Sequence, residues 1–464
     1  MLIWIVFAVF SVVFLCVAAR QLQRNQAIEI LPSLVWYLII VVPFMLTHAG
    51  FSDDFLRAHA QGIFITASAL LVADANGIIK KRQLAPSPFS AGQTCIFAYT
   101  GLAVLLALQG YHLAKMPRIP MLESILHSGI SEMELKVMRE YSSKLLPISP
   151  IFIYAFEISL RILAPLVIVA FMQQRRYVIA AVVLGIELLY SFATLAKGPC
   201  LILILSIILL CYGMLPLVWR KIANIAASVI LLALGVVVVW ILRIHSMSPV
   251  SYRPLPQEIP KISRMSPFTL SDKFRLNDYN NILNTKLSDF ERVLFSTVVY
   301  RSILTPVDVS HRWYIFYPEV YGSYLGIGDL IPGARSAPNF MHPSNRVGLW
   351  AYRDRFPDKY APSVHAYASA DADAHARFGF AGFLWLAAII ISLRRLSYYL
   401  RFAGFFGDSF HIMLIGLFVA IISNGSIQAL LVSSGGILLI AVPLVIHILS
   451  RMNNSPHQVV NNGA

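Results

Sequence analysis

Charged residues are scarce in this chain, and cysteine is scarcer still. Only 13% of its 464 residues are Asp, Glu, Lys or Arg, whereas 58% are hydrophobic. Soluble globular proteins have about 25% charged residues, so the composition excludes an ordinary soluble domain. The four cysteines lie inside apolar runs without CxxC spacing, which argues against a disulfide framework and against a zinc site.

Long apolar runs recur from one end of the chain to the other. Most have about 17–23 residues, enough for a helix to cross a hydrocarbon core of roughly 30 Å. They predict an all-α polytopic membrane protein with about eleven transmembrane helices. The runs are 2–19, 33–48, 60–79, 90–110, 148–172, 177–196, 199–218, 222–242, 379–393, 408–423 and 429–449. The first has no basic region before it and is interpreted as an uncleaved span.

The formal net charge of +14 would suit nucleic-acid binding, but the basic residues are distributed as in a membrane protein. They cluster in alternate connections. The short connections between these, 49–59 and 424–428, contain one basic residue, Arg57. By the positive-inside rule the basic connections are cytoplasmic, which places the N-terminus outside and the C-terminus inside. They carry Arg20 and Arg24; Lys80, Lys81 and Arg82; Arg175 and Arg176; Arg220 and Lys221; Arg394, Arg395 and Arg401; and Arg451.

This topology predicts four parts of the chain. Eight spans lie in residues 1–242, a large external loop domain follows in 243–378, three spans lie in 379–450, and 451–464 form a disordered cytoplasmic tail. Within the loop domain, apolar residues at helical spacing predict a short helix over 287–304. No internal or inverted repeat of the transporter kind is found.

The stretch "HAYASADADAHARFGFAGFL" (365–384) places two aspartates, two histidines and an arginine at the mouth of the ninth span. Its alanines favour a helix, on which Asp371 and His375 share one face and Asp373 and Arg377 share another. We therefore expect one acid to orient His375 and the other to hold Arg377. His375 is then a candidate general base.

Several further polar residues are candidates for substrate contacts. Arginines of the external loop suit a diphosphate, because the guanidinium forms paired charge-assisted bonds with phosphate oxygens; the alternative is a solvated loop balanced by its acids. Lys197 in "TLAKGP" either contacts a lipid-linked phosphate or extends to the membrane surface. Glu157 and Arg161, four residues apart in the fifth span, form either a structural ion pair or a substrate contact.

The stretch "FSDDF" (51–55) offers a different site. Paired acids in an outer loop resemble the metal and acceptor site of many polytopic glycosyltransferases that use lipid-linked donors. Here Asp53 and Asp54 stand alone, and the histidines lack ligand spacing. We therefore expect no metal and no other cofactor.

Larger motifs resemble those of a known family. The stretch "ERVLFSTVVYRSILTPVDVSHRWYIFYPEVYGSYLGIGDLIPG", then "ARFGFAGFL" opening a span, with "KGP" in an earlier hairpin, is similar to the bacterial O-antigen, or oligosaccharide repeat-unit, polymerases of the Wzy type. The resemblance covers roughly residues 150–425. It implies a GT-C-like architecture in the bacterial inner membrane and extension of a glycan on undecaprenyl diphosphate at the periplasmic face, without a metal. The implied partners are that lipid-linked oligosaccharide, the bilayer and a chain-length regulator, with no nucleic acid.

The resemblance also assigns residues. It implies that Lys197 is the hairpin base, Arg301 the arginine before "TP", and Arg377 the arginine of "RFG". The sequence departs from the family at "DADAHAR", where many relatives have an asparagine or a plainer polar run, so the catalytic base is not carried over. The diphosphate is a good leaving group, so the enzyme has to neutralise developing charge and activate one sugar hydroxyl. The expected catalytic residues are His375, Asp371, Arg377 and Arg301, and the expected substrate-binding residues are Lys197, Arg161, His311, Arg312 and Arg346.

Three alternatives stay open. An O-antigen ligase shares this architecture and donor but hands the glycan to the lipid A core. A flippase or other transporter would place its polar residues near the middle of the bilayer and rarely needs so large an outer loop. A purely structural membrane protein leaves the arginines and histidines unexplained.

Overall fold

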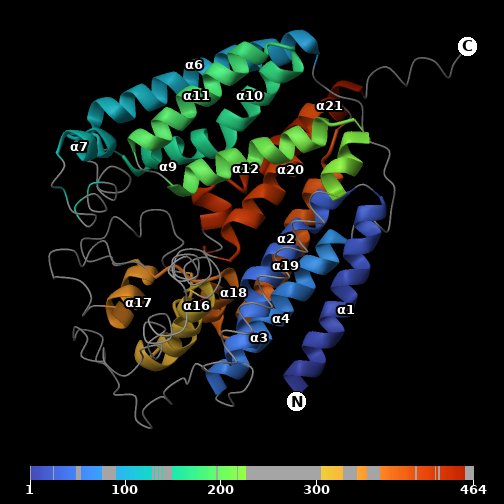
Figure 1. Cartoon of the computed structure of the whole chain (residues 1–464), viewed down its shortest axis with the longest axis vertical. Helices are drawn as coiled ribbons and strands as arrows, with labels where there is room; N and C mark the ends of the chain where they lie inside the picture. Colours follow the sequence, from blue (N-terminus) through green and yellow to red (C-terminus); the bar gives the residue numbers. More distant parts are fainter. Residues whose placement is uncertain are drawn as a thin grey trace, which may run out of the picture. The chain divides into compact units, whose positions relative to one another are not determined.

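The computed structural model describes most of the helical part of the chain. The described residues are 2–24, 26–48, 54–75, 90–127, 149–194, 197–216, 218–225, 305–327, 342–352, 366–402, 405–423, 425–426 and 429–454, together with 130, 134 and 138. They form helices joined by turns, and no strand occurs among them (Figure 1). The all-α class predicted from the sequence is confirmed in this part of the chain.

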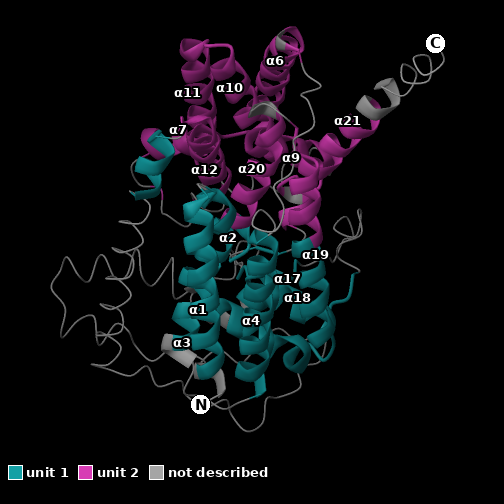
Figure 2. Ribbon diagram, turned by 90° about the vertical axis from the view of Figure 1, so that its right-hand side faces the viewer, with its two compact units in different colours: residues 1–78, 217–391, 421–427 teal, residues 79–216, 392–420, 428–464 magenta. Residues whose placement is uncertain are grey.

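The chain divides into two compact units, each made of segments far apart in the sequence. The first unit contains residues 1–78, 217–391 and 421–427, and the second contains 79–216, 392–420 and 428–464 (Figure 2). Helix α19, Phe380–Tyr399, begins in the first unit and ends in the second.

Helix α4 is the central element of the first unit. It packs against α2, α16 and α18, so an N-terminal helix lies beside two short helices from the predicted external loop. The helices of this unit that precede α19 are α1 (Leu2–Gln23), η1 (Ala27–Ile30), α2 (Leu31–Trp36), η2 (Tyr37–Val41), α3 (Val42–His48), α4 (Asp54–Asp74), α16 (Thr305–Ile315), η6 (Phe316–Val320), α17 (Pro343–Tyr352) and α18 (Ala370–Phe378).

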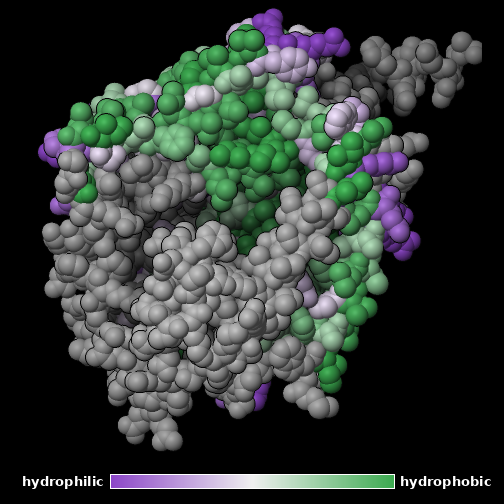
Figure 3. All heavy atoms as spheres, viewed as in Figure 1, coloured by the Kyte–Doolittle hydropathy of each residue, from purple (hydrophilic) through white to green (hydrophobic). Residues whose placement is uncertain are grey.

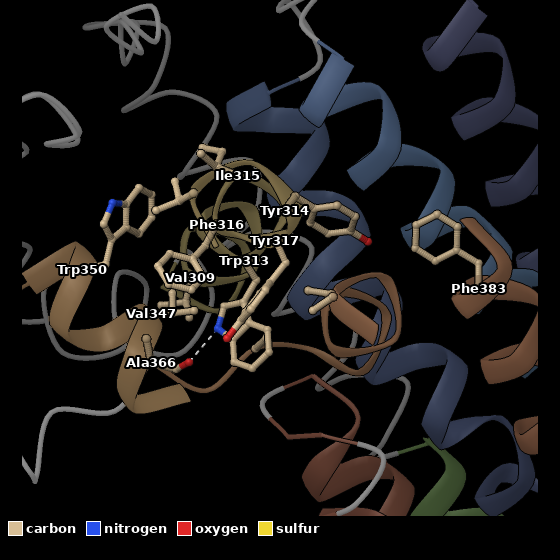
Figure 4. Packing of buried hydrophobic residues seen from close by; sticks show 14 residues of the cluster. Val309, Trp313, Tyr314, Ile315, Phe316, Tyr317, Val347, Trp350, Ala366 and Phe383 are labelled. Carbon is tan, nitrogen blue, oxygen red and sulfur yellow. Dashed lines mark hydrogen bonds between the residues drawn. The ribbon is translucent and has the colours of Figure 1, made fainter. Parts of the chain in front are cut away.

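An aromatic core holds α16, α17 and α18 together. Trp313, Phe316 and Trp350 are almost completely buried, and the indole N–H of Trp313 donates to the carbonyl of Ala366 at 2.8 Å (Figure 4). The hydrogen bond satisfies the polar atom of a large buried ring, which would otherwise lose its interaction with water. This core therefore anchors the segment that leads into α18.

The second unit is a bundle of apolar helices. Helix α10 packs between α6 and α11, and α6 begins with a capping box in which Ser90 and Gln93 each accept from the other's backbone N–H. The elements are α6 (Ala91–Lys115), α7 (Pro120–Leu126), α9 (Pro150–Ile158), η4 (Ser159–Leu163), α10 (Ala164–Gln173), α11 (Tyr177–Ala193), α12 (Lys197–Met214), α20 (Phe405–Ile421), η11 (Ala429–Ser433) and α21 (Leu438–Asn454).

Within the described part of the chain, six helical segments are long and apolar enough to cross a bilayer. They are Ile5–Gln23, Ala27–Met45, Asp54–Asp74, Gly92–Lys115, Ile151–Gln173 and Phe380–Tyr399, and four shorter apolar helices are Tyr177–Ala193, Gly198–Met214, Gly407–Ile421 and Leu438–Leu449. Their apolar side chains are widely exposed, for example Ile96 and Val178, and Figure 3 shows apolar surface over described helices. Such surface suits lipid rather than water, as in a multi-pass membrane protein.

The predicted spans overlap these helices, but several boundaries differ. Helix α4 is Asp54–Asp74 where 60–79 was predicted, α6 continues past residue 110 to Lys115, and the run 429–449 is divided between η11 and α21. Helix α19 continues past residue 393 to Tyr399, and Arg394 within it is buried, so this arginine does not lie in a connection. Helix α21 extends to Asn454, into the segment predicted as a disordered tail. Hydropathy falls at a charged residue, whereas a helix continues through it, because Arg is a good helix former. The total of eleven spans stays a prediction, since 226–242 and the predicted helix 287–304 lie outside the described residues.

Candidate functional site

The predicted helix at "DADAHAR" is present as α18, and it is buried from Ala370 to Arg377. Ser369 precedes its first turn, and Gly379 ends it with a φ of 58° that favours glycine. Two residues into α19, a Cβ on Gly382 would lie 1.9 Å from the carbonyl oxygen of Ala374. Glycine at these two positions allows a tight turn that sets α18 directly before the apolar helix α19.

One of the two predicted pairs is confirmed. Arg377 donates through Nε and Nη2 to the two carboxylate oxygens of Asp373, at 3.1 and 3.2 Å. Its Nη1 also donates to the carbonyl of Gly326 at 3.1 Å. Both side chains are buried, so the pair neutralises two charges in the interior and fixes the turn at Gly326 against α18.

The other predicted pair is wrong. Asp371 accepts from the hydroxyl of Tyr314 at 2.9 Å and from the hydroxyl of Ser369, and neither of its oxygens bonds His375. The Nδ1 atom of His375 is buried without a hydrogen-bond partner in the described part of the chain. The spacing places both side chains on one face, but donors from before the helix and from α16 occupy the carboxylate instead.

Burial changes the acid–base properties of this group. It raises the pKa of Asp371 to about 6, although the bonds from Ser369 and Tyr314 oppose the rise, and it raises the pKa of Tyr314 well above its ordinary value. It lowers the pKa of His375 to about 4. At neutral pH, Asp371 is therefore mostly ionised, whereas Tyr314 and His375 are neutral.

Two residues of the site were missed by sequence reasoning. Tyr314 stacks on His59 of α4, with ring centroids 4.7 Å apart, and its ring is tilted against that of His375, at 4.5 Å. Figure 4 shows Tyr314 on the side of the aromatic core that faces Phe383. The sequence gives no signal for His59, which is the last residue of the predicted connection 49–59. We name Tyr314, Asp371, His375 and His59 the acid–base cluster.

A glycine makes room for the tyrosine. A Cβ on Gly62 of α4 would lie 2.3 Å from the Tyr314 hydroxyl oxygen and 2.6 Å from the Phe383 ring. Real Cβ atoms do not approach so closely, so the position of the hydroxyl depends on glycine at residue 62. Helix α4 therefore contributes both a ring and a gap to the cluster.

The predicted binding residues of the first unit lie in α16 and α17. His311 stacks on His59, with centroids 5.8 Å apart, and Arg312 is buried beside it in the same helix. Arg346 instead bonds the hydroxyl of Tyr321 and lies 5.0 Å from the centroid of that ring. The structure thus brings His311 to the acid–base cluster and gives Arg346 an aromatic partner.

The remaining predicted residues are elsewhere. Arg161 belongs to the second unit, where it pairs with Glu157 at 3.3 Å and bonds Ser434 at 2.7 Å, so the ion pair, one of the two alternatives, is present, and the substrate contact stays a prediction. Lys197 is the first residue of α12 in that unit. Its side chain and the whole of Arg301 are not among the residues that the structure describes.

The structure describes one of the two acids of "FSDDF". Asp53 is outside the described residues, and Asp54 forms an exposed pair with Arg57 at 3.2 Å. Among the residues that are described, no three His, Cys, Asp or Glu side chains are placed to hold a metal ion. The expectation that the protein needs no metal stays a prediction.

The fold and the apolar helices define an all-α, multi-pass membrane protein with a buried acid–base cluster beside a span. Comparison of the chain with protein-family models, with curated proteins and with solved structures finds no match. The function has to be inferred from the cluster itself.

Proposed function

We propose that the protein is a membrane glycosyltransferase that polymerises oligosaccharide repeat units carried on a polyprenyl diphosphate at the periplasmic face. One observation carries the proposal. A neutral histidine, a neutral tyrosine and an ionised carboxylate lie together next to a span, where a lipid-linked substrate would present its sugar. The motif resemblance to repeat-unit polymerases points to the same reaction.

The reaction needs one proton acceptor and fixed positive charge. The hydroxyl oxygen of the acceptor sugar attacks the anomeric carbon of the donor, and the bond from that carbon to the diphosphate oxygen breaks. The hydroxyl proton passes to His375, and the diphosphate leaves with the bonding electron pair. His375 retains slight exposure, whereas Asp371 has none, so His375 is the group that meets the hydroxyl.

Donor binding would itself strengthen this base. Desolvation alone lowers the pKa of His375, so its protonated form is disfavoured before a substrate binds. A diphosphate brought nearby adds negative charge, which favours the imidazolium and raises that pKa toward the working range.

Arg377 acts as a positioning residue in this proposal. Its fork already holds Asp373 and the carbonyl of Gly326, so it supports the helix that carries His375. The family resemblance assigns Arg301, Arg377 and Lys197, and with Arg377 occupied by Asp373, Arg301 is the remaining candidate of the first unit for the diphosphate.

Reconstitution of the full-length protein in liposomes with polyprenyl-diphosphate-linked repeat units as the only substrate tests the proposal. We expect a ladder of products that differ by one repeat unit. A ligase would form product only after addition of a lipid A core acceptor, and a flippase would move the substrate without forming a new glycosidic bond. Either result would contradict the proposal.

Variants locate the reaction within the protein. His375→Ala should lower turnover by about 10²- to 10⁴-fold, as expected for loss of a general base. The matched control is His411→Ala, which removes another buried histidine, bonded to Ser397 at 2.8 Å in the second unit. Equal loss in both variants, in step with the amount of folded protein, would remove His375 from the mechanism.

A further inference from the structure

Two polar pairs cross the contact between α6 and α11 in the second unit. Gln109 donates to the Oε2 atom of Glu187 at 2.5 Å, and His112 Nδ1 lies 2.5 Å from the hydroxyl of Tyr190. The partners increase in number together, so the two helices run in the same direction, and the pairs lie one turn apart. All four side chains are buried between apolar helices.

Glu187 is only half satisfied by this arrangement. Its side chain is fully buried, and its Oε1 atom has no hydrogen-bond partner among the described residues. One turn further along α11, the buried Oγ of Ser191 also lacks a partner in the described chain. An ionised carboxylate with an unpaired oxygen is costly in such a setting.

The surroundings of Glu187 offer no described compensating cation. Helix α10 carries no titratable side chain between Ala164 and Gln173. Glu157 of α9, which pairs with Arg161, lies within electrostatic reach of Tyr190 and adds charge of the same sign. The other titratable groups on helices that contact α11 belong to α6, α7 and α12. They are Cys95, Tyr99, Tyr111 and Lys115 of α6; Glu123 of α7, which pairs with Arg118 and His127; and Lys197, Cys200, Cys211 and Tyr212 of α12, where the Lys197 side chain is not described. Lys115 is exposed and lies 5.6 Å from the centroid of the Tyr111 ring.

We propose that Glu187 is a proton-binding site, separate from the acid–base cluster. Its Oε1 atom takes up a proton from water at neutral pH and releases it at high pH, while Gln109 holds Oε2 in both states. The proton removes the unpaired charge from the contact between α6 and α11, and the adjacent pair of His112 and Tyr190 supplies hydrogen-bonding groups one turn away. The inference does not depend on the proposed polymerase activity.

Dicyclohexylcarbodiimide, an apolar reagent that adds to protonated carboxyl groups, tests the site directly. The full-length protein in native membrane vesicles is treated across a range of pH, digested and analysed by mass spectrometry. We expect an adduct on the peptide that contains Glu187, with labelling that falls about tenfold for each pH unit above its midpoint. Glu157, whose charge is paired with Arg161, should label far less and serves as the internal control.

Two further measurements separate the possible outcomes. Glu187→Gln should remove the adduct, whereas the titration of the unaltered protein requires no variant to fold. Absence of labelling at Glu187 at low pH, or labelling that does not change with pH, would overturn the proposal. Protection by sodium but not by choline at constant pH would also overturn it, because a bound metal cation rather than a proton would then neutralise the carboxylate.

Discussion

Replacement of Asp371 by asparagine should stabilise the protein at neutral pH. Burial raises the pKa of Asp371 from 3.8 to about 6, so keeping this carboxylate ionised in the folded state costs about 3 kcal/mol. Asparagine is neutral at every pH and keeps an oxygen that can accept from Tyr314. After allowance of about 1 kcal/mol for an imperfect replacement, a net gain of about 2 kcal/mol remains.

The gain should depend on pH in a defined direction. Between about pH 4 and pH 6 the folded protein binds more protons at Asp371 than the unfolded chain does, so this contribution to stability is lost as pH rises. The advantage of Asp371→Asn should therefore grow across that window and stay constant above it. His375, with its lowered pKa, has the opposite dependence in the same window, and subtraction of the two proteins' curves cancels it.

Asp373→Asn is a matched control two residues away. It removes the acid that holds the buried Arg377, and loss of one partner of a buried ion pair costs about 3–5 kcal/mol. Two aspartates in one turn of α18 should thus respond in opposite directions. The assay is thermal unfolding of the purified protein in micelles from pH 4 to pH 8. Destabilisation by Asp371→Asn comparable to that by Asp373→Asn would refute the reasoning.

Other predictions concern the support of the cluster and the topology. Gly62→Ala should cost about 1–3 kcal/mol and reduce polymer formation, because its Cβ would displace Tyr314, whereas Gly110→Ala, which meets no atom within 4 Å, should be neutral or slightly stabilising in the same unfolding assay. Arg377→Lys should lower both polymer length and thermal stability, since an ammonium cannot reproduce the fork on Asp373. Activity of the reconstituted protein should survive EDTA, and restoration by Mg²⁺ would instead favour the "FSDDF" site. Cysteines introduced at 300–370 should react with an impermeant reagent in intact cells; reaction only after membrane disruption would reverse the topology.

The helices were predictable because hydropathy is a local property. The run 90–110 corresponds to α6, and the run 148–172 corresponds to the continuous helical stretch from Pro150 to Gln173. The π-helical turn η4 inside that stretch was not predicted, since it depends on backbone hydrogen bonds that no residue pattern marks. The end of α19 was misplaced because Arg394 ends an apolar run without ending a helix.

The pairs within α18 show where spacing stops being informative. Asp373 and Arg377 are four residues apart, opposite in charge and free to form two bonds with each other, so the local prediction and the structure agree. Asp371 and His375 have the same spacing, but desolvation makes the imidazole neutral, which removes the charge that would have drawn the carboxylate to it. The hydroxyls of Ser369 and Tyr314 therefore donate to the carboxylate in place of the imidazole.

The source of those donors explains why the site could not be read from one segment. Tyr314 lies 57 residues before Asp371, and His59 comes from a helix near the other end of the unit's sequence. Their meeting depends on α4 packing against both α16 and α18, which in turn depends on glycine at residue 62 leaving space for a hydroxyl. A catalytic role for His375 is therefore inseparable from an N-terminal span that carries no recognisable motif. Substitutions in α4 that preserve its hydropathy but fill that space should impair the cluster as severely as changes within α18 itself.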